Sequence, residues 1–413
     1  MQEKTVLLVG VCSKQDSAFA YTMIELANLA QACGYRVVCE ITQKLDHTKM
    51  PFYIGKGKLA EIVDMVEQEG IDAVLFNDEL TPSQLKRISE LLKCDVLDRT
   101  MLILEIFASH TKTKEAQLQV EISKLQYQLP RLVNQSDDFD RQGGGSGLIN
   151  RGEGESKLEL TRRQIEAKIA KKSRELTKMV QERKTQRTKR NKSQIKSVAL
   201  VGYTNVGKSS LMNALICDQE EKQVFVKDML FATLETRVRR IKLHKNYECL
   251  LSDTVGFIDK LPHHLVKAFR STLEEVKEAD ILLHVIDISN PYYKQQKQIT
   301  LQTLEAIGIK EIPIINVYNK IDLVDFKYSN TNENLYISTT NNIGIEAVKQ
   351  TIIDALFHDY IDGNFLFPYD ASALVSKMNE TYDILLHEYV EQGIHIIAKV
   401  PKSFYERYKD YQY

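Results

Sequence analysis

The sequence has no tryptophan, and its six cysteines are scattered along the chain without a CxxC pair or a cysteine–histidine cluster. This scatter excludes a disulfide-stapled scaffold and a structural zinc site, and it predicts free, buried thiols in a reducing compartment. The chain also lacks an apolar run of about 18 residues, the length of a membrane-spanning helix. Its first residues, "MQEKTVLLVGVCSKQDS", are too polar for a signal peptide. We therefore expect a soluble, cytoplasmic protein, with a peripheral membrane contact left open.

Net charge gives little reason to expect nucleic-acid binding, because the whole chain carries only −1. The exception is the stretch 157–196, where 15 lysines and arginines outnumber 4 glutamates, an excess of 11 positive charges. A patch this basic is typical of a surface that contacts phosphates, whereas an ordinary solvated helix face carries both signs. An arm that binds anionic lipid is the alternative, but it would present Trp, Phe and Leu on an apolar face. Because tryptophan is absent and leucine is sparse here, we favour RNA.

The first hundred residues alternate short apolar runs with helical patterns, which predicts a small parallel sheet. Expected strands are 5–11, 35–41, 72–78 and 94–100, and expected helices are 17–33, 57–69 and 81–92, the last capped by Thr81 with Pro82 at its first position. Apolar residues then recur at helical spacing over 118–129 and again over 158–180. These stripes predict two long helices in an antiparallel hairpin. The expected loop between them, "DRQGGGSGLINRGEGES" (140–156), holds six of the 18 glycines.

Residues 197–360 return to alternating strands and helices and predict a doubly wound sheet. The expected strands are "SVALVG", "TRVRRIKLH", "YECLLSD", "DILLHVIDIS", "PIINVYN" and "NLYIS". Only the residues "KN" separate the second strand from the third, so these two should form a hairpin. The tail, 364–413, has the pattern strand, helix, strand, strand, helix and predicts a compact α+β module.

The motif "GYTNVGKS" runs from Gly202 to Ser209 and fits the P-loop pattern GxxxxGK[ST]. It follows a hydrophobic strand and opens a helix, which distinguishes a P-loop from a glycine turn with a stray lysine. Gly202 and Gly207 let the backbone turn so that its N–H groups point at phosphates. In this arrangement Lys208 places its charge on the β- and γ-phosphates of a nucleotide, and the hydroxyl of Ser209 binds Mg²⁺.

Three further motifs follow in the order typical of guanine-nucleotide-binding domains. Asp253 ends the strand "YECLLSD" and is suited to hold Mg²⁺ through water, and Gly256 can offer its N–H to the γ-phosphate. In "NKID", Asp322 can accept two hydrogen bonds from guanine N1 and N2, a donor pair that adenine lacks, while Lys320 can pack over the base. Three residues that follow the last strand could support the base from behind, Ser338, Thr339 and Thr340, although most GTPases have alanine at the middle position.

Between the P-loop and Asp253 lies the expected switch I, in which Thr233 is the favoured second Mg²⁺ ligand and Thr236 its rival. Hydrolysis presents a separate question, because Phe257 follows the DxxG glycine where Ras-like GTPases carry the glutamine that orients water. A K⁺ ion at Asn205, help from a large partner and a side chain from switch I are the three substitutes. We expect slow intrinsic turnover, raised by K⁺ and by the partner.

Six long segments allow a comparison with known families: "YIGKGKLAEI" (53–62), 98–132, 141–165, "GYTNVGKSSLMNAL" (202–215), "LFATLETRVRR" (230–240) and 253–287. Together they resemble the HflX family of ribosome-associated GTPases, over nearly the whole chain. Three segments depart from the family's usual form. The linker has Glu153 and Ser156 where GPGET has proline and threonine, switch I has "TLETRVRR" instead of TLDPTTRR, and the P-loop ends in GKSS instead of GKST.

The resemblance implies a GTP hydrolase of low intrinsic rate that binds GTP and GDP with Mg²⁺ and associates with the large (50S) ribosomal subunit. It also implies that the protein splits or rescues stalled or idle ribosomes under stress, with hydrolysis stimulated by the ribosome. The N-terminal domain and the basic linker are expected to contact rRNA, and we expect a monomer away from the ribosome. The candidate RNA contacts flank the glycine-rich loop: Arg141, Arg151, Arg162 and Arg163.

The predicted fold class is α/β, with an N-terminal α/β subdomain (1–100), a helical hairpin with a glycine-rich loop and a basic second arm (101–195), a doubly wound P-loop GTPase sheet (196–361) and an α+β domain (362–413). Predicted catalytic residues are Lys208, Thr233 and Gly256. Predicted nucleotide contacts are Gly202, Tyr203, Thr204, Asn205, Val206, Gly207, Lys208, Ser209, Phe231, Ala232, Thr233, Leu234, Glu235, Asp253, Thr254, Val255, Gly256, Asn319, Lys320, Ile321, Asp322, Ser338, Thr339 and Thr340. Predicted metal ligands are Ser209, Thr233 and, through water, Asp253 for Mg²⁺, and Asn205 for K⁺. The alternative function is an RNA-remodelling ATPase whose nucleotide site lies at "GKGK" (55–58) in the N-terminal domain, although that motif lacks the P-loop spacing.

Overall fold

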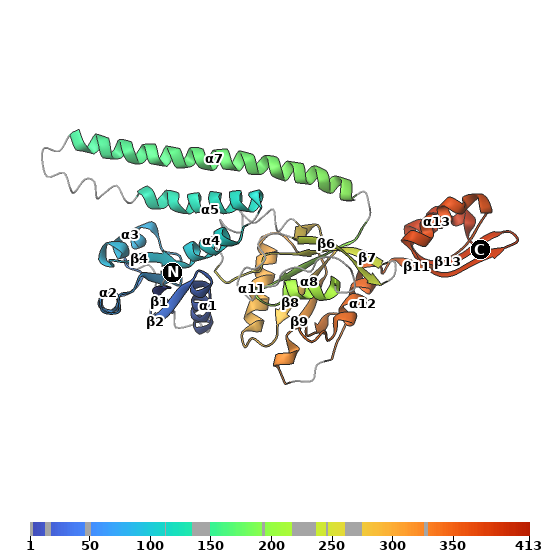
Figure 1. The fold of residues 1–413 in the computed structure, drawn as a ribbon, viewed down its shortest axis with the longest axis horizontal. Coiled ribbons are helices and arrows are strands. Elements are labelled where there is room, and N and C mark those ends of the chain that lie inside the picture. The colour runs from blue at the N-terminus through green and yellow to red at the C-terminus, as the bar shows by residue number, and fades with distance from the viewer. Residues whose placement is uncertain are drawn as a thin grey trace. The chain divides into compact units, whose positions relative to one another are not determined.

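The computed structural model describes residues 3–12, 18–45, 51–111, 113–133, 149–191, 195–216, 237–244, 247–260, 275–325 and 329–413. Figure 1 shows the helices and strands of these ranges along the chain. The chain divides into two compact units. One comprises Met1–Thr188, Lys227–Glu235 and Gly256–Ser271, and the other comprises Lys189–Val226, Thr236–Val255 and Thr272–Tyr413.

The first unit is built on a parallel sheet with the strand order β2-β1-β3-β4. Its strands are β1 (Lys4–Cys12), β2 (Tyr35–Lys44), β3 (Ala73–Phe76) and β4 (Asp95–Asp98). The helices between and after them are α1 (Phe19–Ala32), α2 (Lys56–Glu69), α3 (Pro82–Leu91) and α4 (Arg99–His110). All side chains of β3 are fully buried, as expected for an inner strand of a helix-covered parallel sheet.

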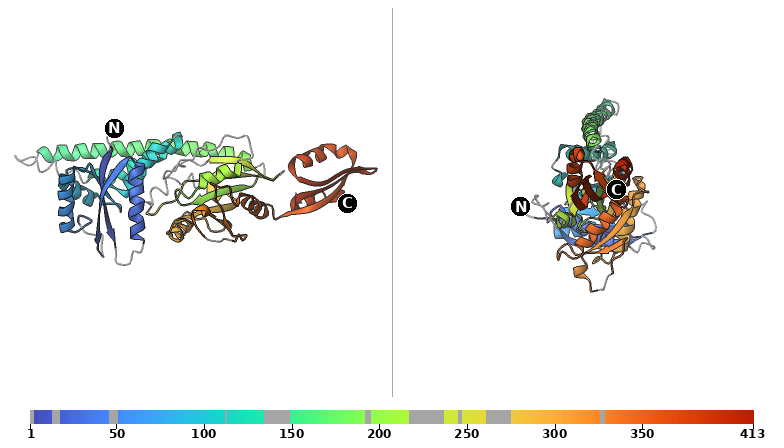
Figure 2. Two further views of the ribbon diagram at one scale, coloured as in Figure 1. Left: turned by 60° about the horizontal axis from the view of Figure 1, so that its bottom comes forward. Right: turned by 90° about the vertical axis from the view of Figure 1, so that its right-hand side faces the viewer.

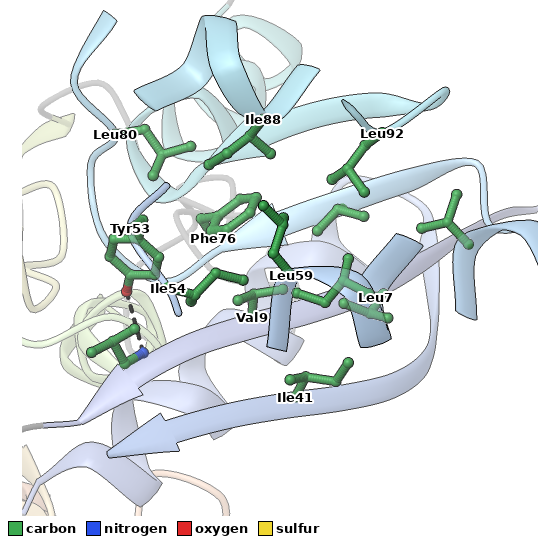
Figure 3. Packing of buried hydrophobic residues seen from close by; sticks show 14 of the residues in the cluster. Leu7, Val9, Ile41, Tyr53, Ile54, Leu59, Phe76, Leu80, Ile88 and Leu92 are labelled. Carbon is green, nitrogen blue, oxygen red and sulfur yellow. Dashed lines mark hydrogen bonds between the residues drawn. The ribbon is translucent and has the colours of Figure 1, made fainter. Parts of the chain in front are cut away.

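A continuous apolar cluster packs α2 and α3 against this sheet (Figure 3). Leu7 of β1 and Phe76 of β3 belong to the same cluster as Leu59 of α2 and Ile88 of α3. Tyr53, in the loop before α2, lies edge-on to Phe76 with ring centroids 5.5 Å apart. Each fully buried apolar side chain of this kind contributes roughly 1.5–3 kcal/mol, so the cluster fixes both helices on the sheet.

The predicted start of α3 is confirmed, and the predicted end of the last strand is wrong. Thr81 and Gln84 form a reciprocal capping box, in which the Thr81 hydroxyl accepts from the Gln84 N–H at 3.3 Å and the Gln84 side chain accepts from the Thr81 N–H at 3.0 Å. The strand expected over 94–100 stops at Asp98, whose carboxylate caps α4 by accepting from the Met101 N–H at 2.9 Å. A short apolar run cannot by itself be assigned to a strand or to a buried helix. Here the cap formed by Asp98 favours a helix from Arg99 onward.

The predicted antiparallel helical hairpin is confirmed in α5 (Lys114–Val133) and α7 (Ile149–Asn191), which lie side by side in Figure 1. Lys114 pairs with Glu175 and Lys172 with Glu121, so the two helices run in opposite directions. With 43 residues, α7 is about 65 Å long. It begins inside the stretch 140–156 that was expected to be loop. Each glycine costs a helix only about 1 kcal/mol relative to alanine, so the two glycines in its first turns do not stop it.

The second unit holds a sheet with the strand order β10-β9-β8-β5-β7-β6 among the described residues. Its strands are β5 (Ser197–Gly202), β6 (Arg237–His244), β7 (Tyr247–Asp253), β8 (Ile281–Asp287), β9 (Ile314–Asn319) and β10 (Asn334–Tyr336). The helices of this part are α8 (Lys208–Ile216), α11 (Tyr293–Ala306) and α12 (Ile345–Leu356). The predicted hairpin is confirmed: β6 and β7 pair antiparallel, whereas the other neighbouring pairs of described strands are parallel.

The C-terminal part of this unit is a separate antiparallel sheet with the order β11-β13-β12 (Figure 2). Its elements are β11 (Tyr360–Phe367), η2 (Tyr369–Ala371), α13 (Ser372–Thr381), β12 (Asp383–Val390), β13 (Gly393–Pro401), α14 (Lys402–Arg407) and η3 (Lys409–Tyr411). Phe365, Phe367, Ile394 and Ile396 are buried in its own small core. The predicted element order of the tail and the predicted fold class of the chain are both confirmed.

The described residues bear on two expectations, the absence of a membrane-spanning helix and the burial of the cysteines. No helix there is long and apolar enough to cross a membrane. Among the described cysteines, only Cys249 is fully buried as expected, and burial raises the pKa of its thiol to about 12. The other described cysteines form no disulfide and are half-buried: Cys12, Cys33, Cys39 and Cys94. Cys217 lies outside the described residues.

Candidate functional site

The motif "GYTNVGKS" forms the connection between β5 and α8. β5 lies between β7 and β8, with β6 beyond β7 on one side and β9 and β10 beyond β8 on the other, so the direction of the strand order changes at β5. The carboxyl end of such a strand is where doubly wound folds bind ligands. Here β5 ends at Gly202 and α8 begins at Lys208. A loop that opens a helix in this way presents backbone N–H groups and the positive end of the helix dipole, which favours an anion.

Glycine is required at two positions of this loop. Gly202 has φ +151° and Gly207 has φ +94°, a region that other residues rarely adopt. Steric room also requires glycine at both positions. A Cβ at Gly202 would collide with the Val285 carbonyl oxygen, and a Cβ at Gly207 would collide with the side-chain amide of Asn319. Asn319 can therefore approach the loop this closely only because Gly207 has no side chain.

Asn319, the last residue of β9, fastens two loops together. Its Nδ2 donates to the Val206 carbonyl oxygen at 3.0 Å, and its Oδ1 accepts from the Thr339 N–H at 3.1 Å. The side chain is fully buried, so both bonds are made out of water, where leaving one of these groups unpaired would cost about 1–3 kcal/mol. Two segments more than 100 residues apart in sequence are thereby fixed at one edge of the sheet.

Lys320 adds a second connection at this edge. Its backbone has φ +65°, and its Nζ donates to the Asn205 carbonyl oxygen at 3.0 Å and pairs with Asp287 at 2.7 Å. Asp287 ends β8, and its carboxylate also accepts from the N–H and the hydroxyl of Ser289. Asp287 is not among the predicted site residues. The signal that could have found it is a carboxylate at the carboxyl end of the strand next to β9, on the edge that carries "NKID".

Lys208, Ser209 and Asp253 lie close together beside the P-loop. Lys208 Nζ donates to the carbonyl oxygens of Tyr203 and Gly202 at 2.6 Å and 3.2 Å, so the loop wraps around its ammonium. Ser209 Oγ donates to Asp253 Oδ2 at 2.6 Å, and Asp253 is fully buried at the end of β7. The predicted lysine, hydroxyl and carboxylate are therefore neighbours in the structure.

Nucleotide binding should depend on pH through Lys208. Burial lowers the pKa of its ammonium to about 8, partly opposed by the Asp253 carboxylate. Since the nucleotide-free protein loses this proton as pH rises through 8, binding phosphates above that pH must take a proton up. Affinity for GDP should then fall by up to about tenfold per pH unit. Calorimetry in two buffers of different ionisation enthalpy should show almost no proton uptake at about pH 7 and close to one proton at about pH 9. Absence of uptake at the higher pH would contradict the shift.

The residues predicted to contact the base lie on the same edge. Asp322 is in the short helix η1 (Ile321–Leu323) and is exposed, so its carboxylate is accessible to a ligand. Ser338 is buried, and its hydroxyl accepts from the Asn341 N–H at 3.1 Å, which shapes the turn after β10. Thr339 and Thr340 follow in that turn, with Thr339 tied to Asn319 as described above.

The remaining predicted residues are exposed, buried or outside the described residues. Asn205 is exposed in the left-handed conformation, with φ +59°. Gly256 belongs to the first compact unit, although Asp253 and the P-loop belong to the second. Five further predicted nucleotide contacts are buried: Tyr203, Thr204, Val206, Thr254 and Val255. Outside the described residues lie Phe231, Ala232, Thr233, Leu234 and Glu235, together with the rival Thr236.

The candidate RNA contacts are described only in part. Arg162 and Arg163 are exposed on α7, and each pairs with a glutamate of the same helix, Glu166 and Glu159, at 3.0 Å. Exposed pairs of this spacing are worth only about 0.3–0.5 kcal/mol, so they leave both guanidinium groups accessible to a phosphate. Arg141 and the side chain of Arg151 lie outside the described residues.

Three features together define a P-loop GTPase. They are a glycine loop between a strand and a helix, a buried Asp253 beside Ser209, and an "NKID" segment hydrogen-bonded to that loop. Family comparisons agree along the chain. A family described as "GTP-binding GTPase N-terminal" matches residues 20–108, one described as "GTP-binding GTPase Middle Region" matches residues 110–190, and one described as "50S ribosome-binding GTPase" matches residues 197–320. The chain belongs to the HflX family of GTPases, and it is a GTP hydrolase.

Individual relatives span nearly the same length. GTPase HflX of Caldanaerobacter subterraneus is 42% identical over 99% of this chain and 94% of its own. GTPase HflX of Escherichia coli is 36% identical over 86% of this chain and 83% of its own. A solved structure, the GTP-binding protein from the hyperthermophilic archaeon Sulfolobus solfataricus in complex with GDP, covers 86% of this chain and 99% of its own, at 26% identity and a TM-score of 0.44.

Proposed function

We propose that this GTPase acts in the cytoplasm on the large ribosomal subunit, where it splits or rescues stalled or idle ribosomes under stress. The observation that carries the proposal is α7, about 65 Å of helix, most of which belongs to the basic stretch 157–196 in a chain whose net charge is only −1. The family description of residues 197–320 names the 50S ribosome as what such GTPases bind. A long basic helix that precedes the GTPase sheet in the chain is suited to contact rRNA phosphates, and we propose that the protein is a monomer off the ribosome.

In this proposal the nucleotide lies along the edge formed by the P-loop, Asp253 and the loop after β10. The P-loop N–H groups and Lys208 hold the phosphates, Asp322 selects guanine, and Gly256 contacts the γ-phosphate. Asn319 acts by holding the loops rather than by touching the base. Residues 231–235 of the expected switch I, which lie outside the described residues, are proposed to contact the nucleotide.

The residues present fit Mg²⁺. The Ser209 hydroxyl and the Asp253 carboxylate lie 2.6 Å apart, and hydroxyl and carboxylate oxygens are the ligands that Mg²⁺ prefers. We propose that Ser209 and Thr233 hold the ion directly and Asp253 holds it through water. When bound, Mg²⁺ neutralises charge on the β- and γ-phosphate oxygens.

Slow intrinsic hydrolysis is proposed from the residue after the DxxG glycine. Phe257 has no hydrogen-bonding group and its side chain is buried, so it does not orient an attacking water. Asn205, exposed in the P-loop, is the proposed site of a K⁺ ion that supplies positive charge there. The remaining stimulation is assigned to the large subunit.

GTP turnover in four conditions tests this function: K⁺ or Na⁺, each with and without purified large subunits. We expect at least about tenfold stimulation by the subunits and a further increase in K⁺, because each supplies part of the charge stabilisation that Phe257 cannot. A variant with Arg162→Gln and Arg163→Gln should keep its intrinsic rate and need more subunits for half-maximal stimulation. Lys310→Ala, an exposed lysine of the GTPase sheet unit, is the matched control. Equal rates in all four conditions would contradict the proposal.

A further inference from the structure

The edge strands of the two parallel-rich sheets are protected against pairing with another chain. An exposed edge presents unpaired N–H and C=O groups, and native proteins protect it with a short strand, charged side chains, proline or a covering segment. β4 and β10 are only four and three residues long. β2 carries the exposed Arg36 and Lys44. β6 carries the exposed Arg240 and Lys242, so each of these four edges has one of the usual protections.

The C-terminal sheet, with the order β11-β13-β12, has one edge that the chain itself covers. Residues 412–413 lie along β11. Gln412 forms an isolated antiparallel bridge with Phe365, and the Tyr413 N–H donates to the Asn364 carbonyl oxygen at 3.1 Å. The edge of β11 is therefore partly paired, although no regular strand is added there.

The other edge of this sheet is β12, and it lacks these protections. Among the strands that the structure describes, β12 pairs with β13 alone. It has eight residues, "DILLHEYV", without lysine, arginine or proline. Its register is shifted between Ile384 and Leu386, so that residues 386–390 form a regular stretch. An open edge of this kind is suited to receive a further strand.

The two faces of β12 present different chemistry at this edge. His387 and Tyr389 share one face, with ring centroids 5.3 Å apart, and Tyr389 is 71% exposed. Glu388 lies on the opposite face, and its side chain is 57% exposed. None of the eight residues of β12 is buried. An added strand would therefore meet an aromatic surface on one face and a carboxylate on the other.

The charge around this edge is negative. Residues 360–413 contain eight acidic and five basic residues, a net charge of −3, whereas the stretch 157–196 carries +11. Asp383 begins β12, Glu388 lies within it and the exposed Glu391 follows it directly. Lys399 of β13 lies opposite Asp383 in the register, at the far end of the strand from Glu391. A nucleic acid is repelled by such a surface, whereas a segment rich in lysine or arginine is complementary to it.

We propose that β12 binds an extended segment of a partner protein by strand addition, and that this segment alternates apolar with basic side chains. In this mode main-chain hydrogen bonds give affinity and alternate side chains give specificity. Successive side chains of the added strand point to opposite faces, so every second one lies on the face of Tyr389 and the others on that of Glu388. Aromatic residues pair well with β-branched ones and carboxylates with lysine or arginine, which defines the chemistry of the partner.

The test uses the full-length protein and an eight-residue peptide of alternating valine and lysine, blocked at both ends. Replacing lysine by glutamate in the peptide should weaken binding at least about fivefold, because attraction to Glu388 becomes repulsion. N-methylation of the four central residues removes main-chain donors and leaves the side chains and the charge unchanged. It should also weaken binding at least about fivefold. Isothermal titration calorimetry measures each affinity.

Two variants test the side chains of β12. Glu388→Lys should reverse the preference, so that the glutamate peptide binds more tightly than the lysine peptide, a gain that misfolding cannot produce. Tyr389→Ser should weaken binding of the lysine peptide about threefold or more, because the valines lose an aromatic neighbour. Glu311→Lys is the matched control, since it reverses an exposed glutamate elsewhere in the same compact unit. It should leave the preference for the lysine peptide unchanged.

Equal binding of the N-methylated and unmodified peptides would overturn the proposal, because the main chain would then take no part. An unchanged preference in Glu388→Lys, or a reversed one in Glu311→Lys, would do the same. Two other occupants of the edge give different results. Self-association that is lost in Tyr389→Ser would identify a second copy of this chain, and single-stranded RNA binding lost in that variant would identify a nucleic acid. Either result would contradict a basic protein segment as the partner.

Discussion

Replacing Asp322 with asparagine is expected to weaken GTP and GDP binding by about 10²- to 10⁴-fold, because two charge-assisted hydrogen bonds at roughly 1.5–3 kcal/mol each would be lost. The carboxylate is proposed to accept from guanine N1–H and N2–H. The side-chain oxygen of asparagine can accept from only one of these two guanine groups. Its N–H₂ group then faces the other guanine N–H, and two donors repel each other. Xanthine carries a carbonyl oxygen at C2 and can accept from that amide.

The variant should therefore bind xanthosine diphosphate more tightly than the unmodified protein does, which a general loss of folding cannot produce. Asp325→Asn is the matched control, because Asp325 is an exposed carboxylate three residues further along the same segment. Titration of both variants with guanosine and xanthosine diphosphates gives the comparison. If Asp325→Asn lost as much GDP affinity as Asp322→Asn, or if xanthosine diphosphate binding did not improve, the assignment of Asp322 to the base would be wrong.

Lys208→Ala is expected to lower nucleotide affinity at least about a hundredfold, because hydrogen bonds to charged groups are worth roughly 1.5–3 kcal/mol each and two phosphates lose theirs. The fold should lose little by the change. Since burial lowers the pKa of Lys208 to about 8, the ammonium is less favoured in its site than in water. A buried charge of this kind is maintained for its ligand.

Binding and stability are therefore expected to separate in this variant. Thermal unfolding without nucleotide should be nearly unchanged, while GDP should no longer raise the unfolding temperature as it does in the unmodified chain. Lys310→Ala, an exposed lysine of the same unit that pairs with Glu305, should change neither. A large drop in the nucleotide-free unfolding temperature of Lys208→Ala would show that the lysine stabilises the fold, and the affinity loss could then not be assigned to phosphate contacts.

Local patterns in the sequence predict most of the fold. The hairpin of β6 and β7 follows from the two residues between them, and the start of α3 follows from Thr81 and Pro82, because turns and caps are decided by neighbouring residues. The end of β4 was predicted incorrectly, since an apolar run after Asp98 suits a strand or a buried helix equally. The start of α7 lies inside the predicted loop, because glycine costs a helix only about 1 kcal/mol relative to alanine and the two glycines there do not end it.

The residues of the candidate site could be predicted where they belong to one continuous motif. The contacts between two motifs that are distant in sequence could not be predicted. The P-loop and "NKID" can be read from spacing, and residues 202–209 lie between strand and helix as expected. The bonds of Asn319 to Val206 and Thr339 join segments that only the sheet brings together, and the Lys320–Asp287 pair depends on β8 being the neighbour of β9.

The fastening by Asn319 also determines how a nucleotide can leave. One buried side chain holds the phosphate loop and the loop after β10 in a common position. Displacing either loop breaks one of these two bonds and loosens the side chain that positions the other loop, so we expect the proposed guanine and phosphate subsites to loosen together. A factor that accelerates nucleotide exchange is therefore expected to be able to act at either loop.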